Sequence, residues 1–207
     1  KPMIDINGKP IIFHIMANYA RYGHKDFLIA GGYKSNLIKR FFKKKYSDWS
    51  IKVIDTGINT MTGGRIKKLK KYLKNEPFFL TYGDGLSNIN IKKLLKFHKK
   101  NKKFVTLTAV RPPARFGVVK TKGSLVKYFK EKSKGDEGWI NGGFFVMEPK
   151  FINFIKNNQT YLEREPLEKV TKLKQLTAYK HTGYWQCVDT KRDLDKVRET
   201  FKINVKK

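Results

Sequence analysis

Segments with a helical pattern and segments with a strand pattern alternate along the first half of the chain. The helical segments carry apolar residues at helical spacing and cover residues 10–22, 35–45, 64–74 and 90–100. Short apolar runs typical of buried strands lie between them, at residues 27–30, 51–54, 78–82 and 104–110. Strands joined through helices of this length indicate right-handed βαβ units, so we expect an α/β fold with a largely parallel sheet.

The pattern changes after Pro112 and Pro113. Two strand-like segments, 116–120 and 125–129, flank Thr121-Lys122-Gly123-Ser124 and predict a hairpin. Residues 139–147 form a further extended run that contains glycines. We expect this second half to extend the sheet and to form a lid or wall over it. Since composition marks no boundary, one domain is predicted for residues 1–207.

Length and cysteine content narrow the class of protein. With 207 residues and 40% hydrophobic residues, the chain can build a substantial core. Cys187 is the only cysteine, so no intrachain disulfide can form, and a cytoplasmic location is favoured. No apolar run is long enough to span a bilayer, and the first residues lack the apolar core of a signal peptide.

The formal net charge of +29 raises the question of nucleic-acid binding. Only 8 of the 46 basic residues are arginine, although bidentate and sequence-specific recognition depends on arginine. The lysines are also spread over nearly every helical segment. We therefore interpret the charge as a compositional bias that gives solvated surfaces and attracts anionic substrates, and we consider a nucleic-acid partner unlikely.

An aspartate ends each of two apolar runs. Asp84 stands between Gly83 and Gly85 after the strand at 78–82, and Asp189 ends the run 184–189. In open α/β sheets ligands bind beyond the carboxyl ends of the strands, and Mg²⁺ is often held by one or two carboxylates together with substrate phosphates. Two such aspartates would make a Mg²⁺ site. The alternative is a turn or a helix N-cap, above all for Asp189, because Thr190 opens a helical pattern.

The loop at residues 55–65 follows a strand and opens a helix. Its glycines and hydroxyl residues suit an anion at a helix N-terminus, and Arg65 is placed to hold a phosphate or a base. The alternative is an ordinary loop in which Thr62 caps the helix. Farther along the chain, Glu131 and Lys132 suit a sugar hydroxyl and a phosphate, although such a dipeptide is usually plain surface.

Asn141-Gly142-Gly143 interrupts an extended run, which indicates either backbone placed against a ligand or a bulge. The histidines show no metal-ligand spacing and no triad-like order with Cys187 or a serine. His98 follows an apolar helical stripe, which predicts a partly buried structural role. The sequence gives no support for nucleophilic catalysis.

Taken together, these segments closely resemble the bacterial glucose-1-phosphate cytidylyltransferases, a branch of the sugar nucleotidyltransferase family. The matching segments span almost the whole chain in one order: Lys1-Pro2-Met3, Gly8-Lys9-Pro10-Ile11, Gly32-Tyr33-Lys34, Asp55-Thr56-Gly57, Met61-Thr62-Gly63-Gly64-Arg65, Thr81-Tyr82-Gly83-Asp84-Gly85, Arg115-Phe116-Gly117, Phe129-Lys130-Glu131-Lys132, Ile140-Asn141-Gly142-Gly143-Phe144-Phe145, Glu165-Pro166-Leu167, Gly183-Tyr184-Trp185-Gln186 and Asp189-Thr190. The resemblance implies a Rossmann-like, three-layer α/β fold with a mixed, mainly parallel sheet.

The resemblance also implies roles for single residues. Asp84 and Asp189 would hold Mg²⁺, and Lys1 would contact the triphosphate and the sugar phosphate. The nucleotide half, 1–110, would bind cytidine triphosphate (CTP) through Thr60, Arg65 and Gly83. The sugar-phosphate half, 111–207, would bind glucose 1-phosphate through Gly117, Glu131, Lys132, Asn141, Gly142 and Trp185. The implied product is CDP-glucose, a precursor of lipopolysaccharide O-antigen sugars.

The family pattern opens with a strand and a glycine-rich loop that cradles the nucleotide phosphates, and the chain begins after this element. We therefore expect an N-terminally truncated fold in which the strands at 27–30 and 78–82 lack a partner between them, which favours a homo-oligomer or aggregation. Three alternatives remain: a nucleotidyltransferase that uses dTTP or UTP, a non-catalytic remnant that binds a nucleotide sugar, and a nucleic-acid-binding protein.

Overall fold

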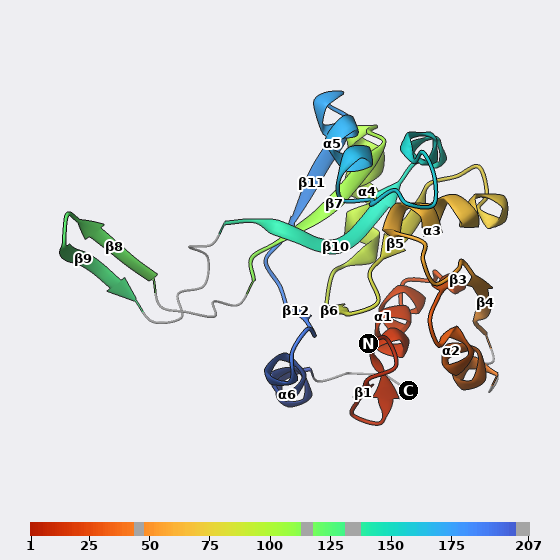
Figure 1. Cartoon of the computed structure of the whole chain (residues 1–207), viewed down its shortest axis with the longest axis horizontal. Coiled ribbons are helices and arrows are strands. Elements are labelled where there is room, and N and C mark those ends of the chain that lie inside the picture. Colours follow the sequence, from red (N-terminus) through yellow and green to blue (C-terminus); the bar gives the residue numbers. More distant parts are fainter. Residues whose placement is uncertain (44–47, 113–117, 131–137, 202–207) are drawn as a thin grey trace.

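The computed structural model describes residues 1–43, 48–112, 118–130 and 138–201 (Figure 1). Its helices are α1 (Ile11–Ala20), α2 (Ser35–Phe42), α3 (Thr62–Leu69), α4 (Ile91–Asn101), α5 (Glu165–Lys172) and α6 (Lys191–Thr200), with the 3₁₀ helices η1 (Lys70–Tyr72) and η2 (Pro149–Phe154). Its strands are β1 (Asp5–Ile6), β2 (Lys9–Pro10), β3 (Asp26–Gly31), β4 (Ser50–Asp55), β5 (Phe78–Thr81), β6 (Gly85–Ser87), β7 (Val105–Val110), β8 (Val118–Lys122), β9 (Leu125–Lys130), β10 (Ile140–Met147), β11 (Leu176–His181) and β12 (Trp185–Cys187).

The central sheet has four strands in the order β11-β7-β10-β5. Strands β7 and β11 are parallel, whereas β10 is antiparallel to both β5 and β7, so that Phe145 lies opposite Leu80 on one side and Leu107 on the other. Three of these strands therefore run in one direction and β10 runs against them. The expected α/β fold with a mixed, mainly parallel sheet is confirmed, and segments from both halves of the chain build it.

Strand β10 is buried on both faces, which produces the three layers. Phe144 and Val146 point into one core with α1, α4 and α6, while Phe145 and Met147 point into a second core with α3, η2 and α5. This follows from the period of two along a strand, which sends alternate side chains to opposite faces. Because every residue in this part of β10 is apolar, both layers can pack on it.

Strands β3 and β4 form a separate parallel pair, with Ala30 beside Ile54. Within the described residues β3 is not hydrogen-bonded to β5, so each of them is the edge of its own sheet. Helix α1 contacts both sheets: the ring of Phe13 stacks on Trp49, just before β4, at 5.3 Å, and the ring of Tyr19 packs against Phe79 of β5 at 5.3 Å. The same tyrosine also hydrogen-bonds the hydroxyl of Thr81.

Several sequence-based boundaries differ from the structure. The helix predicted at 64–74 begins at Thr62 and ends at Leu69, where a 3₁₀ turn takes over. The helix predicted to reach residue 45 ends at Phe42, and the residues just beyond position 43 lie outside the described part. His98 was expected to be partly buried, but it is fully buried. The prediction of a lid is wrong for the hairpin: β8 and β9 stand away from the sheet (Figure 1), while β10 and β11 do extend it.

Candidate active site

Two segments of the chain meet where Asp84 lies, just beyond the end of β5. After β5 the segment Tyr82-Gly83-Asp84 leads into β6, which pairs antiparallel with β12 so that Cys187 lies opposite Gly85. The amide of Val188 donates a hydrogen bond of 3.0 Å to the carbonyl of Asp84. This short pairing places the segment 187–189 against Asp84, although more than 100 residues separate them in sequence.

Asp84 and Asp189 lie together, as the sequence predicted. One ligand atom each from Asp84, Cys187 and Asp189 lie within 4.8 Å of one another. Burial raises the pKa of the Asp84 carboxyl, and the nearby Asp189 raises it further, while Lys1 opposes the shift. Two carboxylates that lie this close repel each other, and a cation between them would offset that repulsion.

The alternative role of Asp189 as a helix cap does not hold. The N-cap of α6 is Thr190, whose side chain accepts a hydrogen bond from the amide of Asp193, while the carboxylate of Asp193 accepts one from the amide of Thr190. This reciprocal pair is a complete capping box. The carboxylate of Asp189 is instead directed toward Lys1 and Cys187.

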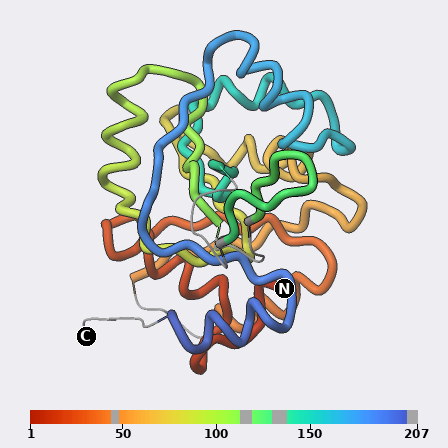
Figure 2. Tube along the Cα trace, turned by 90° about the vertical axis from the view of Figure 1, so that its left-hand side faces the viewer, coloured from red at the N-terminus to blue at the C-terminus, as the bar shows by residue number. Residues whose placement is uncertain are grey.

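Lys1, at the N-terminus, contacts the carboxylate of Asp189. Its Nζ donates a hydrogen bond of 2.7 Å to Oδ1 of Asp189, which raises the pKa of the Lys1 ammonium. Figure 2 shows the N-terminus beside the segment that leads into α6. Gly83 is also close, since a Cβ placed on it would lie 3.1 Å from Cγ of Pro2. Three of the predicted site residues, Lys1, Asp84 and Asp189, therefore meet.

Arg65 joins the loops that follow β3 and β4. Its guanidinium donates to the carbonyl of Gly31 at 3.1 Å, to Oγ1 of Thr56 at 2.6 Å and to the carbonyl of Ile58 at 3.3 Å. Thr60, the other residue predicted on the nucleotide side, is buried and donates its hydroxyl to the carbonyl of Thr56 at 2.6 Å. These hydrogen bonds hold the loop before α3 in place, so Arg65 also stabilises the structure of this loop.

The proposal that Thr62 caps α3 is wrong. Thr62 is the first residue of the helix, and its hydroxyl donates to Oε2 of Glu163 at 2.7 Å. The helix start packs tightly on the following loop, because a Cβ on Gly64 would lie 2.4 Å from the carbonyl oxygen of Asn158. Only glycine fits there.

On the sugar-phosphate side, Trp185 and Gly142 are in contact. The indole Nε1 of Trp185 donates to the carbonyl of Gly142 at 2.8 Å, and Oδ1 of Asn141 accepts from the amide of Gly143 at 2.9 Å. The register of β10 against β7 shifts between Asn141 and Phe145, so the bulge reading of this segment is confirmed. Gly143 has φ of +75°, which favours glycine. Gly117, Glu131 and Lys132 lie outside the described residues.

Sequence reasoning missed Glu163 and Tyr82. The Tyr82 hydroxyl donates to Glu163, whose other oxygen accepts from Thr62, so that one carboxylate ties the end of β5 to the start of α3. Burial and Glu163 raise the pKa of the Tyr82 phenol. No sequence signal marked Glu163, because a glutamate among other charged residues, here Arg164 and Glu165, is usually solvated surface.

Comparison with known proteins decides the family. A family model described as nucleotidyl transferase matches residues 1–202. The chain belongs to the nucleotidyl transferase family. This nucleotidyl transferase is 42% identical to the glucose-1-phosphate cytidylyltransferase of Salmonella typhimurium, over 93% of the chain and 84% of the relative. It is 37% identical to a probable glucose-1-phosphate cytidylyltransferase of Bacillus subtilis, over 97% of the chain and 87% of the relative. The resemblance stated from the sequence is confirmed.

Solved structures support the fold of this nucleotidyl transferase. HddC from Yersinia pseudotuberculosis complexed with GMP-PN matches with a TM-score of 0.74 at 22% identity, over 97% of the chain and 89% of the neighbour. A UDP-glucose pyrophosphorylase complexed with UDP-glucose matches with the same TM-score at 16% identity and the same coverage. At such identities the likeness shows the fold. A search of the described residues for a helix that could cross a membrane found none.

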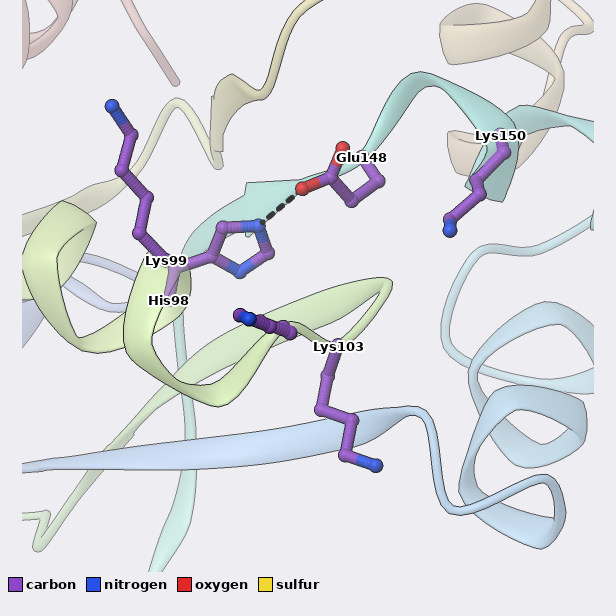
Figure 3. A pocket seen from close by; sticks show the side chains of 6 residues that line it. His98, Lys99, Lys103, Glu148 and Lys150 are labelled. Carbon is purple, nitrogen blue, oxygen red and sulfur yellow. Dashed lines mark hydrogen bonds and ion pairs between the residues drawn. The ribbon is translucent and has the colours of Figure 1, made fainter.

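Figure 3 shows a basic pocket of this nucleotidyl transferase. It lies at the opposite strand ends from Asp84, because it adjoins the end of β10, which pairs with the starts of β5 and β7, whereas Asp84 follows the end of β5. It holds about 290 Å³ and lies between the end of α4 and the end of β10; its lining residues are His98, Lys99, Lys102, Lys103, Glu148 and Lys150. His98 hydrogen-bonds the hydroxyl of Thr106 at 2.8 Å and Glu148 at 3.3 Å. Burial lowers the pKa of His98, although Glu148 opposes this. The histidine is thus a structural link between α4, β7 and β10.

Proposed function

We propose that this nucleotidyl transferase forms CDP-glucose and pyrophosphate from CTP and glucose 1-phosphate. The observation that carries the proposal is the meeting of Lys1, Asp84 and Asp189 at one edge of the sheet. The 42% identity to a glucose-1-phosphate cytidylyltransferase supports the choice of substrates. A crevice beyond the strand ends is where α/β sheets bind nucleotides.

We propose Mg²⁺ as the metal, held by the carboxylates of Asp84 and Asp189. The donor set fits, because Mg²⁺ prefers oxygen ligands and commonly uses one or two carboxylates together with substrate phosphates. When bound, the ion would neutralise negative charge on the phosphates. The raised pKa of Asp84 supports this role, since an added cation would favour the ionised carboxylate.

The protein's own part in the reaction is positioning and charge. An oxygen of the glucose 1-phosphate group attacks the α-phosphorus of CTP, a new phosphorus–oxygen bond forms, and the bond to the bridging oxygen breaks with release of pyrophosphate. The ammonium of Lys1 lies where it can stabilise charge on the reacting phosphates. A phosphate monoester is largely ionised at neutral pH, so the reaction needs no general base, which agrees with a site that contains no histidine among its described residues.

We assign the two substrates to the two halves of a single domain. In residues 1–110 the loop held by Arg65 and Thr60, with Gly83, would face the nucleotide. In residues 111–207 the segment with Asn141, Gly142 and Trp185 would face glucose 1-phosphate. The remaining residues assigned to the sugar side are Gly117, Glu131 and Lys132.

Pyrophosphate release by the purified full-length protein tests the proposal, with glucose 1-phosphate, Mg²⁺ and each of CTP, UTP and dTTP. We expect CTP to be preferred, because a base that leaves buried polar groups unpaired loses about 1–3 kcal/mol for each. Equal rates with all three triphosphates would contradict the cytidylyltransferase assignment. Binding of CDP-glucose without any turnover would support the non-catalytic alternative instead.

We also propose that the protein forms a homo-oligomer. The hairpin of β8 and β9 exposes Val119, Val126 and Phe129, and the edge of β5 that faces away from β10 has no strand partner among the described residues. Apolar surface and open strand edges both favour association. Light scattering coupled to size-exclusion chromatography measures the mass, and a monodisperse monomer at micromolar concentration would contradict the proposal.

A further inference from the structure

The register of β12 places Cys187 on the same side of the chain as the proposed metal site. Alternate residues of a strand point to opposite faces, and Gln186 and Val188 are the buried ones. Trp185, Cys187 and Asp189 therefore share the other face, where Trp185 reaches Gly142 and Asp189 reaches Lys1. The direction of the Cys187 thiol is thus set by the backbone.

The thiol is close to both carboxylates. Its Sγ donates to Oδ2 of Asp189 at 3.4 Å, and the ligand atoms of Asp84, Cys187 and Asp189 all lie within 4.8 Å of one another. The carboxylates alone account for the proposed Mg²⁺ site, so the sulfur is a donor that the proposed reaction does not use. The search for groups of metal ligands among the described residues returned this cluster.

We propose that Cys187 is a third donor that lets this site bind thiophilic divalent cations, of the class of Zn²⁺ and Cd²⁺, in competition with Mg²⁺. The inference rests on the proposed function, because it uses the two carboxylates assigned there to Mg²⁺. It adds a mode of inhibition by zinc-like ions that depends on one sulfur atom.

The chemistry of the donors supports the inference. Zn²⁺ binds thiolate sulfur at about 2.3 Å and carboxylate oxygen at about 2.0–2.2 Å, usually with four ligands. Three donors within 4.8 Å of one another can reach such an ion after small side-chain movements, which leaves one position for water. Soft ligands select zinc-like ions, whereas Mg²⁺ prefers oxygen alone. On binding, the metal–sulfur bond forms and the thiol proton passes to solvent.

The test uses the full-length protein without nucleotide and follows the ultraviolet absorption of a thiolate-to-Cd²⁺ bond during titration with Cd²⁺. Cys187 is the only cysteine of the chain, so within these residues the signal has a single source. We expect saturable absorption at one equivalent. We also expect Asp84→Asn and Asp189→Asn each to weaken the Cd²⁺ affinity about tenfold or more, since each removes a charged ligand.

Asp195→Asn is the matched control, because Asp195 is an exposed aspartate on α6 and the same charge is removed away from the cluster. Its Cd²⁺ affinity should equal that of the unaltered protein. In addition, Cys187→Ser should weaken Zn²⁺ binding about tenfold or more in competition with a colorimetric chelator.

Absence of the absorption, or equal Cd²⁺ affinity in the Asp84→Asn, Asp189→Asn and Asp195→Asn variants, would overturn the inference. The result is separable from the proposed function, which turnover of CTP measures. Turnover without the Cd²⁺ signal would leave the function standing and refute the role of Cys187. The signal without turnover would leave the role of Cys187 standing and refute the function.

Discussion

The Nζ atom of Lys1 donates a hydrogen bond of 2.7 Å to the Oδ1 atom of Asp189, across 188 positions of sequence. The side chains are 51% and 48% exposed, and exposed ion pairs contribute little to stability. A lysine held at a carboxylate beside Asp84 therefore matters for charge at the site more than for the fold.

Lys1→Ala in the full-length protein should lower kcat/KM for CTP about a hundredfold, because a charge that stabilises the transferring phosphate is lost. The free energy of unfolding should change by less than about 1 kcal/mol. Steady-state kinetics and urea denaturation measure the two effects. A loss of activity accompanied by a fall of several kcal/mol in the free energy of unfolding would indicate a structural role for Lys1.

Asp84→Asn should remove most turnover and yet stabilise the metal-free protein. The pKa of Asp84 is raised by burial and by Asp189, so its ionised form opposes folding at neutral pH, and a neutral amide removes that cost. We expect a gain of less than about 1 kcal/mol, because solvent screens the charge of this partly exposed carboxyl. Thermal melts without divalent metal measure it, and a lower melting temperature would contradict the argument.

Arg65→Ala should impair nucleotide use and also destabilise the protein. The substitution leaves the buried Oγ1 of Thr56 without its guanidinium donor, which costs about 1–3 kcal/mol. The double variant Lys99→Ala/Lys103→Ala is the control, because both lysines line the basic pocket at the opposite strand ends from Asp84. If this control raised KM for CTP as much as Arg65→Ala did, the assignment of Arg65 to the nucleotide side would be wrong.

Stability should fall as the pH is lowered from about 7.5 to about 5.5. Burial lowers the pKa of both His14 and His98 in the folded protein, so the unfolded chain binds more protons in this range. The stability contributed by each neutral histidine is therefore present above its unfolded pKa of about 6.5 and is lost as the pH falls toward the folded value. His98→Gln should flatten this dependence in denaturant titrations at several pH values, whereas Lys99→Ala should leave it unchanged.

The periodic parts of the fold could be predicted from the sequence. The apolar stripe of α1 predicted a helix, and the apolar run at 78–82 predicted a strand. The end of that strand indicated Asp84 as a candidate site residue. Helix α5 and strand β11 were missed. Strand β11 reads Leu-Thr-Ala-Tyr-Lys-His, in which apolar residues are too few to separate it from a loop, and its position is set by pairing with the already buried β7.

The candidate site was predictable to a similar degree. Asp84 and Asp189 could be paired because both end apolar runs, and family resemblance added Lys1. The contact of Tyr82 with Glu163 could not be predicted, because it joins residues 81 positions apart through the packing of three elements. The place of Cys187 beside Asp84 depends on the register of β12 against β6, and strands of three residues are too short to show their register in sequence.

Among the described residues β3 and β5 belong to separate sheets, so we expect the amides of the two sheets to differ in their resistance to opening. Amides in β7 and β10 lie between neighbouring strands, whereas the β3–β4 pair contacts other elements through side chains such as Arg65, which donates to the carbonyl of Gly31. Local opening along such a boundary needs less free energy than global unfolding, and hydrogen exchange detects it. The proposed nucleotide loop lies beside the β3–β4 pair, where Arg65 contacts Gly31 and Thr56. A bound nucleotide that contacts this loop and Gly83 would therefore slow hydrogen exchange in both sheets.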